Sequence, residues 1–139
     1  MGERKSMIAL TDKQKKFLEA TNFAFVATVN KDGSPQVTPT WVDTDGKYVF
    51  INVTPQRQKA KNLQREPRIA IAVTDQANPY SMISIRGKVV EQIAGKEAEE
   101  HIDKLAKKYL GQDKYPYRQP NEKRLLLKIE PTSIAGWGS

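Results

Sequence analysis

The sequence predicts a single domain of 139 residues, an antiparallel barrel of mainly β structure with short helices between its strands. Three observations favour this α+β class over a doubly wound sheet: about six segments with strand composition, turn signals between them, and few helical segments. A chain of this length can bury roughly two-thirds of its unfolded surface, enough for one core. We expect residues 1–139 to form that domain, with residues 1–10 as a flexible tail.

A first helix is predicted to begin at Thr11. Thr11 and Gln14 match a capping box, in which each side chain accepts a hydrogen bond from the other residue's backbone N–H. Phe17 and Leu18 anchor the face that packs inward.

Three strands should follow, over residues 23–30, 36–43 and 47–53. Each is rich in apolar or β-branched residues. An Asp-Gly turn joins the first two strands, which is typical of a hairpin. A second Asp-Gly turn precedes the third strand, which is expected to extend the hairpin into a meander.

A short basic helix is predicted after the third strand. Thr54 can cap it, and Pro55 is tolerated at a first helical position. We expect it to run to about Arg65 and to stop at Glu66-Pro67, because proline disfavours helical backbone in the residue before it.

The rest of the chain alternates between strands and one long helix. Strands are predicted over residues 68–74, 80–93 with a kink at Gly87, and 124–130. The helix is predicted over residues 95–110, where four apolar residues recur with helical spacing. They are Ala98, Ile102, Leu105 and Tyr109.

Gly111 caps this helix, and residues 112–120 form a loop. Because His101 neighbours Ile102 on the helix, we expect its side chain to face solvent.

The composition excludes several classes of function. There is no cysteine and only one histidine, so disulfides and a transition-metal centre are not expected. The apolar runs are far shorter than the roughly 20 residues that span a bilayer, and no signal-peptide segment is present. We expect a cytoplasmic protein.

The formal net charge of +7 is concentrated in one segment. Residues 57–68 carry five basic residues against one acid, Glu66, a net +4. The basic residues are Arg57, Lys59, Lys61, Arg65 and Arg68. A nucleic-acid binder would spread its charge along a stripe with interleaved aromatic residues, whereas a compact basic site suits one small anion.

The start of the basic helix is the candidate anion site. Free backbone N–H groups at a helix N-terminus carry about half a positive charge. Arg57 can bind a phosphate through two nitrogens, and Lys59 adds a point charge. The alternative is a solvated amphipathic helix, with Ala60 and Leu63 packed inward and the charges in water.

The segment 35–41 is a second candidate. Pro39 interrupts the predicted strand and leaves a gap in the hydrogen-bond ladder where a ligand can approach, and Trp41 can face that gap. Alternatively, Trp41 belongs to the core and Pro39 marks a bulge at a sheet edge.

The order of these motifs resembles the pyridoxamine-phosphate-oxidase-like split β-barrel superfamily. The relevant motifs are D-G-S-P-Q-V-T-P-T-W over 32–41, T-x-x-R-x-K-x-K-N-L over 54–63, E-P-R over 66–68 and the helix and loop over 101–116. Within the superfamily the chain is most similar to the branch of oxidoreductases that use the deazaflavin coenzyme F-420.

The resemblance implies a homodimer with the cofactor in a groove between subunits. It places Arg57 and Lys59 at the cofactor phosphate, with Thr54 and Asn62 beside it, and Lys61 is a further candidate for binding the cofactor. Pro39, Thr40 and Trp41 would line the ring system. Residues of the partner chain would complete the pocket, and the matching candidates are Asn78, Tyr80 and Trp137.

The expected function is hydride transfer from reduced coenzyme F-420 to a small conjugated acceptor. Lys61, Arg65 and Arg68 favour this cofactor over FMN, because coenzyme F-420 continues beyond its phosphate into an anionic glutamate tail. No side chain need act as a nucleophile. The alternatives are an FMN-binding oxidoreductase of the same fold and a non-enzymatic protein that binds a cofactor or nucleic acid.

Overall fold

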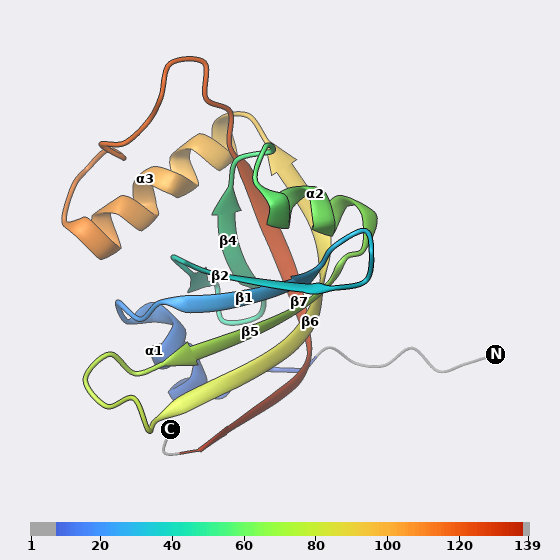
Figure 1. Cartoon of the computed structure of the whole chain (residues 1–139). Helices are drawn as coiled ribbons and strands as arrows, with labels where there is room; N and C mark the ends of the chain where they lie inside the picture. The colour runs from blue at the N-terminus through green and yellow to red at the C-terminus, as the bar shows by residue number, and fades with distance from the viewer. Residues whose placement is uncertain (1–7, 138–139) are drawn as a thin grey trace.

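A computed structural model describes residues 8–137 of the chain, and Figure 1 shows their seven strands and three helices. The elements in chain order are α1 (Asp12–Glu19), β1 (Ala24–Val29), β2 (Pro35–Thr40), β3 (Asp43–Thr44), β4 (Val49–Val53), α2 (Gln58–Arg65), β5 (Arg68–Thr74), β6 (Met82–Ala94), α3 (Lys96–Leu110) and β7 (Leu125–Trp137). The mainly β fold predicted from the sequence is confirmed. Most of the expected tail, residues 1–7, lies outside the described residues, whereas Leu10 is buried in the core.

The strands form one antiparallel sheet in the order β2-β1-β5-β6-β7-β4-β3. The predicted β1–β2 hairpin is confirmed, with Phe25 opposite Pro39. The predicted meander is wrong, because β4 pairs with β7 and with the short β3, not with β2. Apolar alternation identifies a strand and its inward face but does not select its neighbour.

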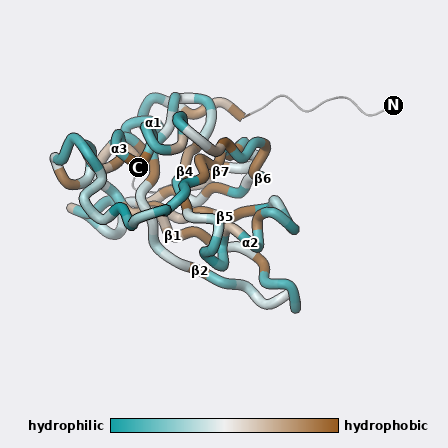
Figure 2. Tube along the Cα trace, turned by 90° about the horizontal axis from the view of Figure 1, so that it is seen from above, coloured by the Kyte–Doolittle hydropathy of each residue, from teal (hydrophilic) through white to brown (hydrophobic). Residues whose placement is uncertain are grey.

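The core lies on the concave side of this sheet, and Figure 2 shows hydrophobic stretches along the central strands. Its fully buried members come from nearly every strand. They include Val26, Ile51, Ile71, Ile83, Ile85, Leu127 and Ile129.

Helix α1 begins at the predicted capping box, where Thr11 Oγ1 accepts a 3.1 Å hydrogen bond from Gln14 N. Helix α3 contacts β4, β6 and β7, so it covers one end of the sheet.

Strand β6 bends at Gly87, where the pairing register with β7 shifts. The predicted kink is therefore confirmed. A Cβ at Gly87 would lie 2.5 Å from the carbonyl oxygen of Glu130, which is closer than any side chain tolerates. Strand β7 continues past its predicted end at residue 130 through Pro131, which lies opposite Gly87 and is accommodated by this irregularity.

Within the described residues no helix is long and apolar enough to cross a membrane. The same part of the chain contains no group of three or more His, Asp or Glu side chains placed to hold a metal ion.

Gly87→Ala is expected to lower the free energy of unfolding by about 1–3 kcal/mol, because the new methyl group can fit only if β6 and β7 move apart. Urea denaturation measures the change. Ser84→Ala, in the same strand, is the control and is expected to change stability far less. Equal effects of the two substitutions would show that the strands are not held this closely at Gly87.

Candidate functional site

A pocket of about 550 Å³ lies where the two ends of the sheet face each other. One wall is the edge strand β2. The other is the end of β4 together with the segment that leads into α2 (Figure 1). The lining residues are Gln36, Thr38, Pro39, Thr40, Asn52, Val53, Thr54, Arg57, Gln58, Lys59 and Arg124.

Three of these residues are basic and none is acidic. Arg57 is exposed and, among residues 8–137, its side chain forms no ion pair or hydrogen bond. Lys59 is buried, and its Nζ donates a 3.2 Å hydrogen bond to Thr38 Oγ1. Burial, followed by repulsion from Arg57 and Arg124, lowers the pKa of Lys59 below its ordinary value. Arg124 forms a 3.2 Å ion pair with Glu122, so Arg57 and Lys59 are the cations of this pocket that have no ion-pair partner among residues 8–137.

The start of α2 differs from the prediction. Residues Thr54–Arg57 form a turn, in which Arg57 N donates a 3.1 Å hydrogen bond to Thr54 O. The helix begins at Gln58 with Arg57 as its N-cap, so Pro55 is not its first residue and Thr54 does not cap it. The cap makes no side-chain hydrogen bond, which leaves the first N–H groups of α2 beside the pocket without an intrahelical partner.

The pocket brings together five of the residues singled out from the sequence. They are Pro39, Thr40, Thr54, Arg57 and Lys59. The gap predicted at Pro39 is absent, because the pairing of β2 with β1 continues through it without a bulge. Its missing N–H is tolerated because β2 is an edge strand.

Two other predicted residues of α2 do not line the pocket. Lys61 is exposed. Asn62 is fully buried, and its Nδ2 donates 2.9 Å hydrogen bonds to Thr28 Oγ1 and Asn30 Oδ1. Asn62 therefore holds α2 against β1.

The basic residues that follow in the chain are engaged by the protein itself. Arg65 donates a hydrogen bond to the carbonyl oxygen of Val29, and Arg68 forms a 2.9 Å ion pair with Glu66. Of the three cations assigned to a glutamate tail, Lys61 is the one whose side chain forms neither an ion pair nor a hydrogen bond within residues 8–137.

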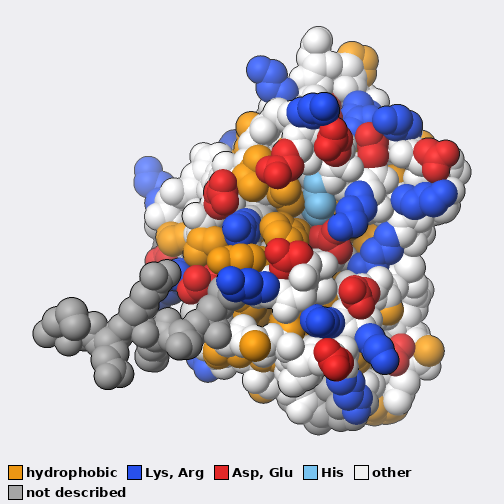
Figure 3. Space-filling model, turned by 180° about the vertical axis from the view of Figure 1, so that it is seen from behind, with side chains coloured by type: hydrophobic (Ala, Val, Ile, Leu, Met, Phe, Trp, Pro, Cys, Tyr) orange, Lys and Arg blue, Asp and Glu red, His pale blue; other side chains and the backbone are white. Residues whose placement is uncertain are grey.

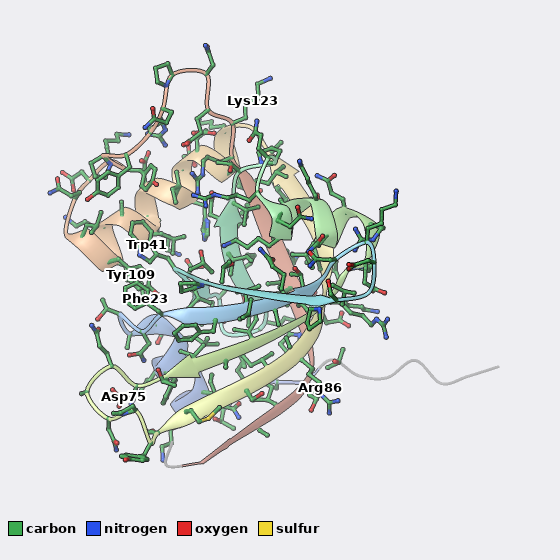
Figure 4. The ribbon with its side chains drawn as sticks, viewed as in Figure 1. Phe23, Trp41, Asp75, Arg86, Tyr109 and Lys123 are labelled. Atoms are coloured by element: carbon green, nitrogen blue, oxygen red, sulfur yellow. The ribbon has the colours of Figure 1, made fainter. Side chains whose placement is uncertain are left out.

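Trp41 lies outside this pocket, in an aromatic cluster at the end of α3 (Figure 4). Its ring stacks on Tyr109 at 5.1 Å between centroids and meets Tyr115 edge-on. Tyr109 holds the cluster in place, since its hydroxyl accepts a hydrogen bond from Val42 N and donates one to Asn22 O. Burial raises the pKa of Tyr109 to about 12.

The three residues expected to act from a partner chain lie elsewhere. Asn78 and Tyr80 belong to the turn between β5 and β6, and Tyr80 is 84% exposed. The backbone of Trp137 pairs with Met82, and its side chain is outside the described residues. Neither Asn78 nor Tyr80 lines this pocket.

Sequence reasoning missed several lining residues. Gln36 and Thr38 share the inward side of β2 with Thr40, and this polar alternation on a strand facing the core was a usable signal. No signal points to Asn52 or Arg124, which meet only in the folded chain. Arg124 Nε donates a 2.8 Å hydrogen bond to Asn52 Oδ1.

The expectation that His101 faces solvent is wrong. Its side chain is buried on the inner face of α3, where it follows Ala98 by three residues and precedes Leu105 by four. Figure 3, which shows the molecule from behind, has a small part of the histidine visible between hydrophobic and charged side chains. Hydrogen bonds to Asp43 and Asn52 satisfy both ring nitrogens, so an ionisable side chain can occupy this inward position.

A family model described as pyridoxamine 5'-phosphate oxidase matches residues 10–138. The chain belongs to this family. No curated protein sequence matches it.

Solved structures support the family fold. An F-420 reductase is 28% identical with a TM-score of 0.78, and the match covers 91% of this chain and 98% of the reductase. A conserved hypothetical protein from Mycobacterium tuberculosis is 21% identical with a TM-score of 0.71, covering 99% and 89%. HupZ of Group A Streptococcus is 20% identical with a TM-score of 0.67, covering 94% and 95%. At these lower identities the last two matches show the fold alone.

Lys59→Met is expected to stabilise the free protein by about 1 kcal/mol, because it removes a buried charge repelled by Arg57 and Arg124. The same variant is expected to lose affinity for phosphate. Thermal unfolding and a phosphate titration measure the two effects. Lys61→Met, on the exposed side of the same helix, is the control for both. A less stable Lys59→Met protein with unchanged phosphate affinity would contradict the anion site.

Proposed function

We propose that this pocket binds the phosphodiester of the deazaflavin coenzyme F-420 and that the protein is an F-420-dependent oxidoreductase acting as a homodimer. The observation that carries the proposal is the convergence of Arg57, Lys59 and Arg124 on a pocket with no carboxylate in its lining. Burial, followed by repulsion from Arg57 and Arg124, lowers the pKa of Lys59, and a bound anion would counter this by stabilising the charged ammonium.

The residues present fit a phosphate group. Arg57 has a guanidinium without a protein partner among the described residues and can bind two phosphate oxygens. Lys59 contributes a charge from a position fixed by Thr38. Thr54 and the first N–H groups of α2 add neutral donors.

Two observations favour coenzyme F-420 over FMN. The F-420 reductase shares 28% identity with this chain over nearly its whole length. In addition, Lys61 is exposed four residues after Arg57 along α2, where it can meet the anionic tail that extends beyond the phosphate. Because Arg65 and Arg68 have protein partners, the basic segment does not form the free stripe that a nucleic-acid binder would need.

Reduced coenzyme F-420, when bound, supplies the hydride for an unsaturated organic acceptor. The chain's own contribution is to bind and orient, since the pocket lining contains no histidine, carboxylate or tyrosine. Tyr115 does not line the pocket, but it is the proposed proton donor because its ring lies 5.2 Å from the guanidinium of Arg124, which does.

The proposed dimer would use the outer face of the sheet. Phe25 and Val37 lie on adjacent strands of this face and are 43% and 62% exposed. Ala70 and Ala72 of β5 extend the same apolar face. A second copy that covered it would remove these side chains from water, and Asn78, Tyr80 and Trp137 stay the residues proposed to complete the partner's pocket.

Titration of intrinsic tryptophan fluorescence with coenzyme F-420 and with FMN tests the proposal. We expect tighter binding of coenzyme F-420. Arg57→Ala should weaken it by about 1.5–3 kcal/mol, the scale of a charge-assisted hydrogen bond. Tyr48→Phe, which lies outside the pocket, is the control and should bind as the wild type does. Unchanged affinity in Arg57→Ala would refute the phosphate assignment, and tighter binding of FMN would select the alternative cofactor.

A further inference from the structure

Four buried side chains link the pocket to the underside of α3. Arg124 Nε lies 2.8 Å from Asn52 Oδ1, and Asn52 Nδ2 lies 3.1 Å from His101 Nδ1. His101 Nε2 lies 2.9 Å from Asp43 Oδ1. The four residues are between 4% and 9% exposed, so water competes little for their hydrogen bonds.

The donor and the acceptor of each hydrogen bond that joins these four side chains can be assigned. A guanidinium can only donate, so the oxygen of the Asn52 amide must face Arg124. Its nitrogen then faces α3 and donates to both Ala98 O, at 3.0 Å, and His101 Nδ1. Because Nδ1 accepts, the proton of the neutral imidazole is on Nε2, which donates to the Asp43 carboxylate.

This arrangement fixes the guanidinium of Arg124 at two of its three nitrogens. Asn52 holds Nε, and Glu122 Oε2 lies 3.2 Å from Nη1. Nη2 makes no hydrogen bond to any residue that the structure describes, and Arg124 lines the pocket. The nitrogen left over is therefore available to a ligand.

We propose that Arg124 is a third anion-binding group of the pocket and that His101 is a positioning residue that orients it through Asn52. The proposal rests on the proposed function, because it assumes an anionic ligand. Without the acceptor at Nδ1, one hydrogen of the Asn52 amide has no partner, and the amide can rotate away from Arg124. The imidazole of His101 does not contact the ligand and acts on it only through Asn52 and Arg124.

Two substitutions separate positioning from simple packing. His101→Asn places an oxygen near the position of Nδ1 and keeps the acceptor for Asn52, whereas His101→Leu fills the space without one. Both variants lose the hydrogen bond to Asp43, so the effect of this loss is the same in each. Asp43 keeps its ion pair with Lys104, at 3.6 Å, in both. The first readout is the NMR signal of the Arg124 Nε–H in the protein without ligand. The second is the Kd for coenzyme F-420.

We expect His101→Leu to shift the Arg124 Nε–H signal, to speed its exchange with water and to weaken binding about tenfold. His101→Asn should keep the signal and bind within about a factor of two of the wild type. In an Arg124→Ala background, His101→Leu should cost no further affinity, because its effect passes through Arg124.

The proposal is overturned if His101→Leu leaves the Arg124 signal and the Kd unchanged, or if it weakens binding equally in the Arg124→Ala background. The wild-type protein offers a test that needs no variant, since ¹⁵N NMR of the His101 ring must show the proton on Nε2. A proton on Nδ1 would also overturn it. Failure of the wild type to bind coenzyme F-420 would instead contradict the proposed function. The NMR comparison of the free proteins, together with the Kd for inorganic phosphate in place of coenzyme F-420, would still decide the positioning.

Discussion

The positive charge of Arg57 and Lys59, which no carboxylate among residues 8–137 pairs with, is the constraint on which the site depends. Lys59 is buried beside Arg57 and Arg124, and burial together with these neighbours lowers its pKa. Proteins avoid this arrangement unless something offsets it, because a buried charge without a counter-ion is costly. A buried cation that lacks a counter-ion in the protein is typical of a binding site, where the ligand supplies the counter-ion.

The fold creates this constraint by leaving its sheet open. The two edges of the sheet, β2 and the β3–β4 end, are not joined by hydrogen bonds, and the pocket lies between them. The long strands β6 and β7 make the sheet curve, with an irregular pairing at Gly87. Arg57 and Lys59 then reach the pocket from the start of α2, and Arg124 reaches it from the segment before β7. Charges distant in the sequence meet because the sheet curves without closing.

Local chemistry made much of this fold predictable from the sequence. The capping box at Thr11, the β1–β2 hairpin and the kink at Gly87 each depend on a few neighbouring residues, and all three are confirmed. The partner of β4 was not predictable, because strand pairing depends on residues more than 70 positions away. The start of α2 was placed too early, since Thr54 and Pro55 suit a turn as well as a helix.

The candidate site shows the same division. Arg57 and Lys59 belong to one short motif and could be found from it, but Arg124 has no neighbouring signal in the sequence. His101 was assigned to solvent because helical spacing alone does not reveal Asp43 and Asn52 as buried partners. Polar residues that are satisfied by distant partners are the ones that a linear pattern hides.

The pKa of Lys59 is the most direct measure of the central claim. It can be followed by ¹³C NMR at the Cε carbon, with and without coenzyme F-420. The pKa should lie below the ordinary value of 10.5 in the free protein and should rise when the phosphate-bearing ligand binds. If Lys59 had its ordinary pKa in the free protein and the ligand did not change it, the assignment of this pocket as an anion-binding site would be contradicted.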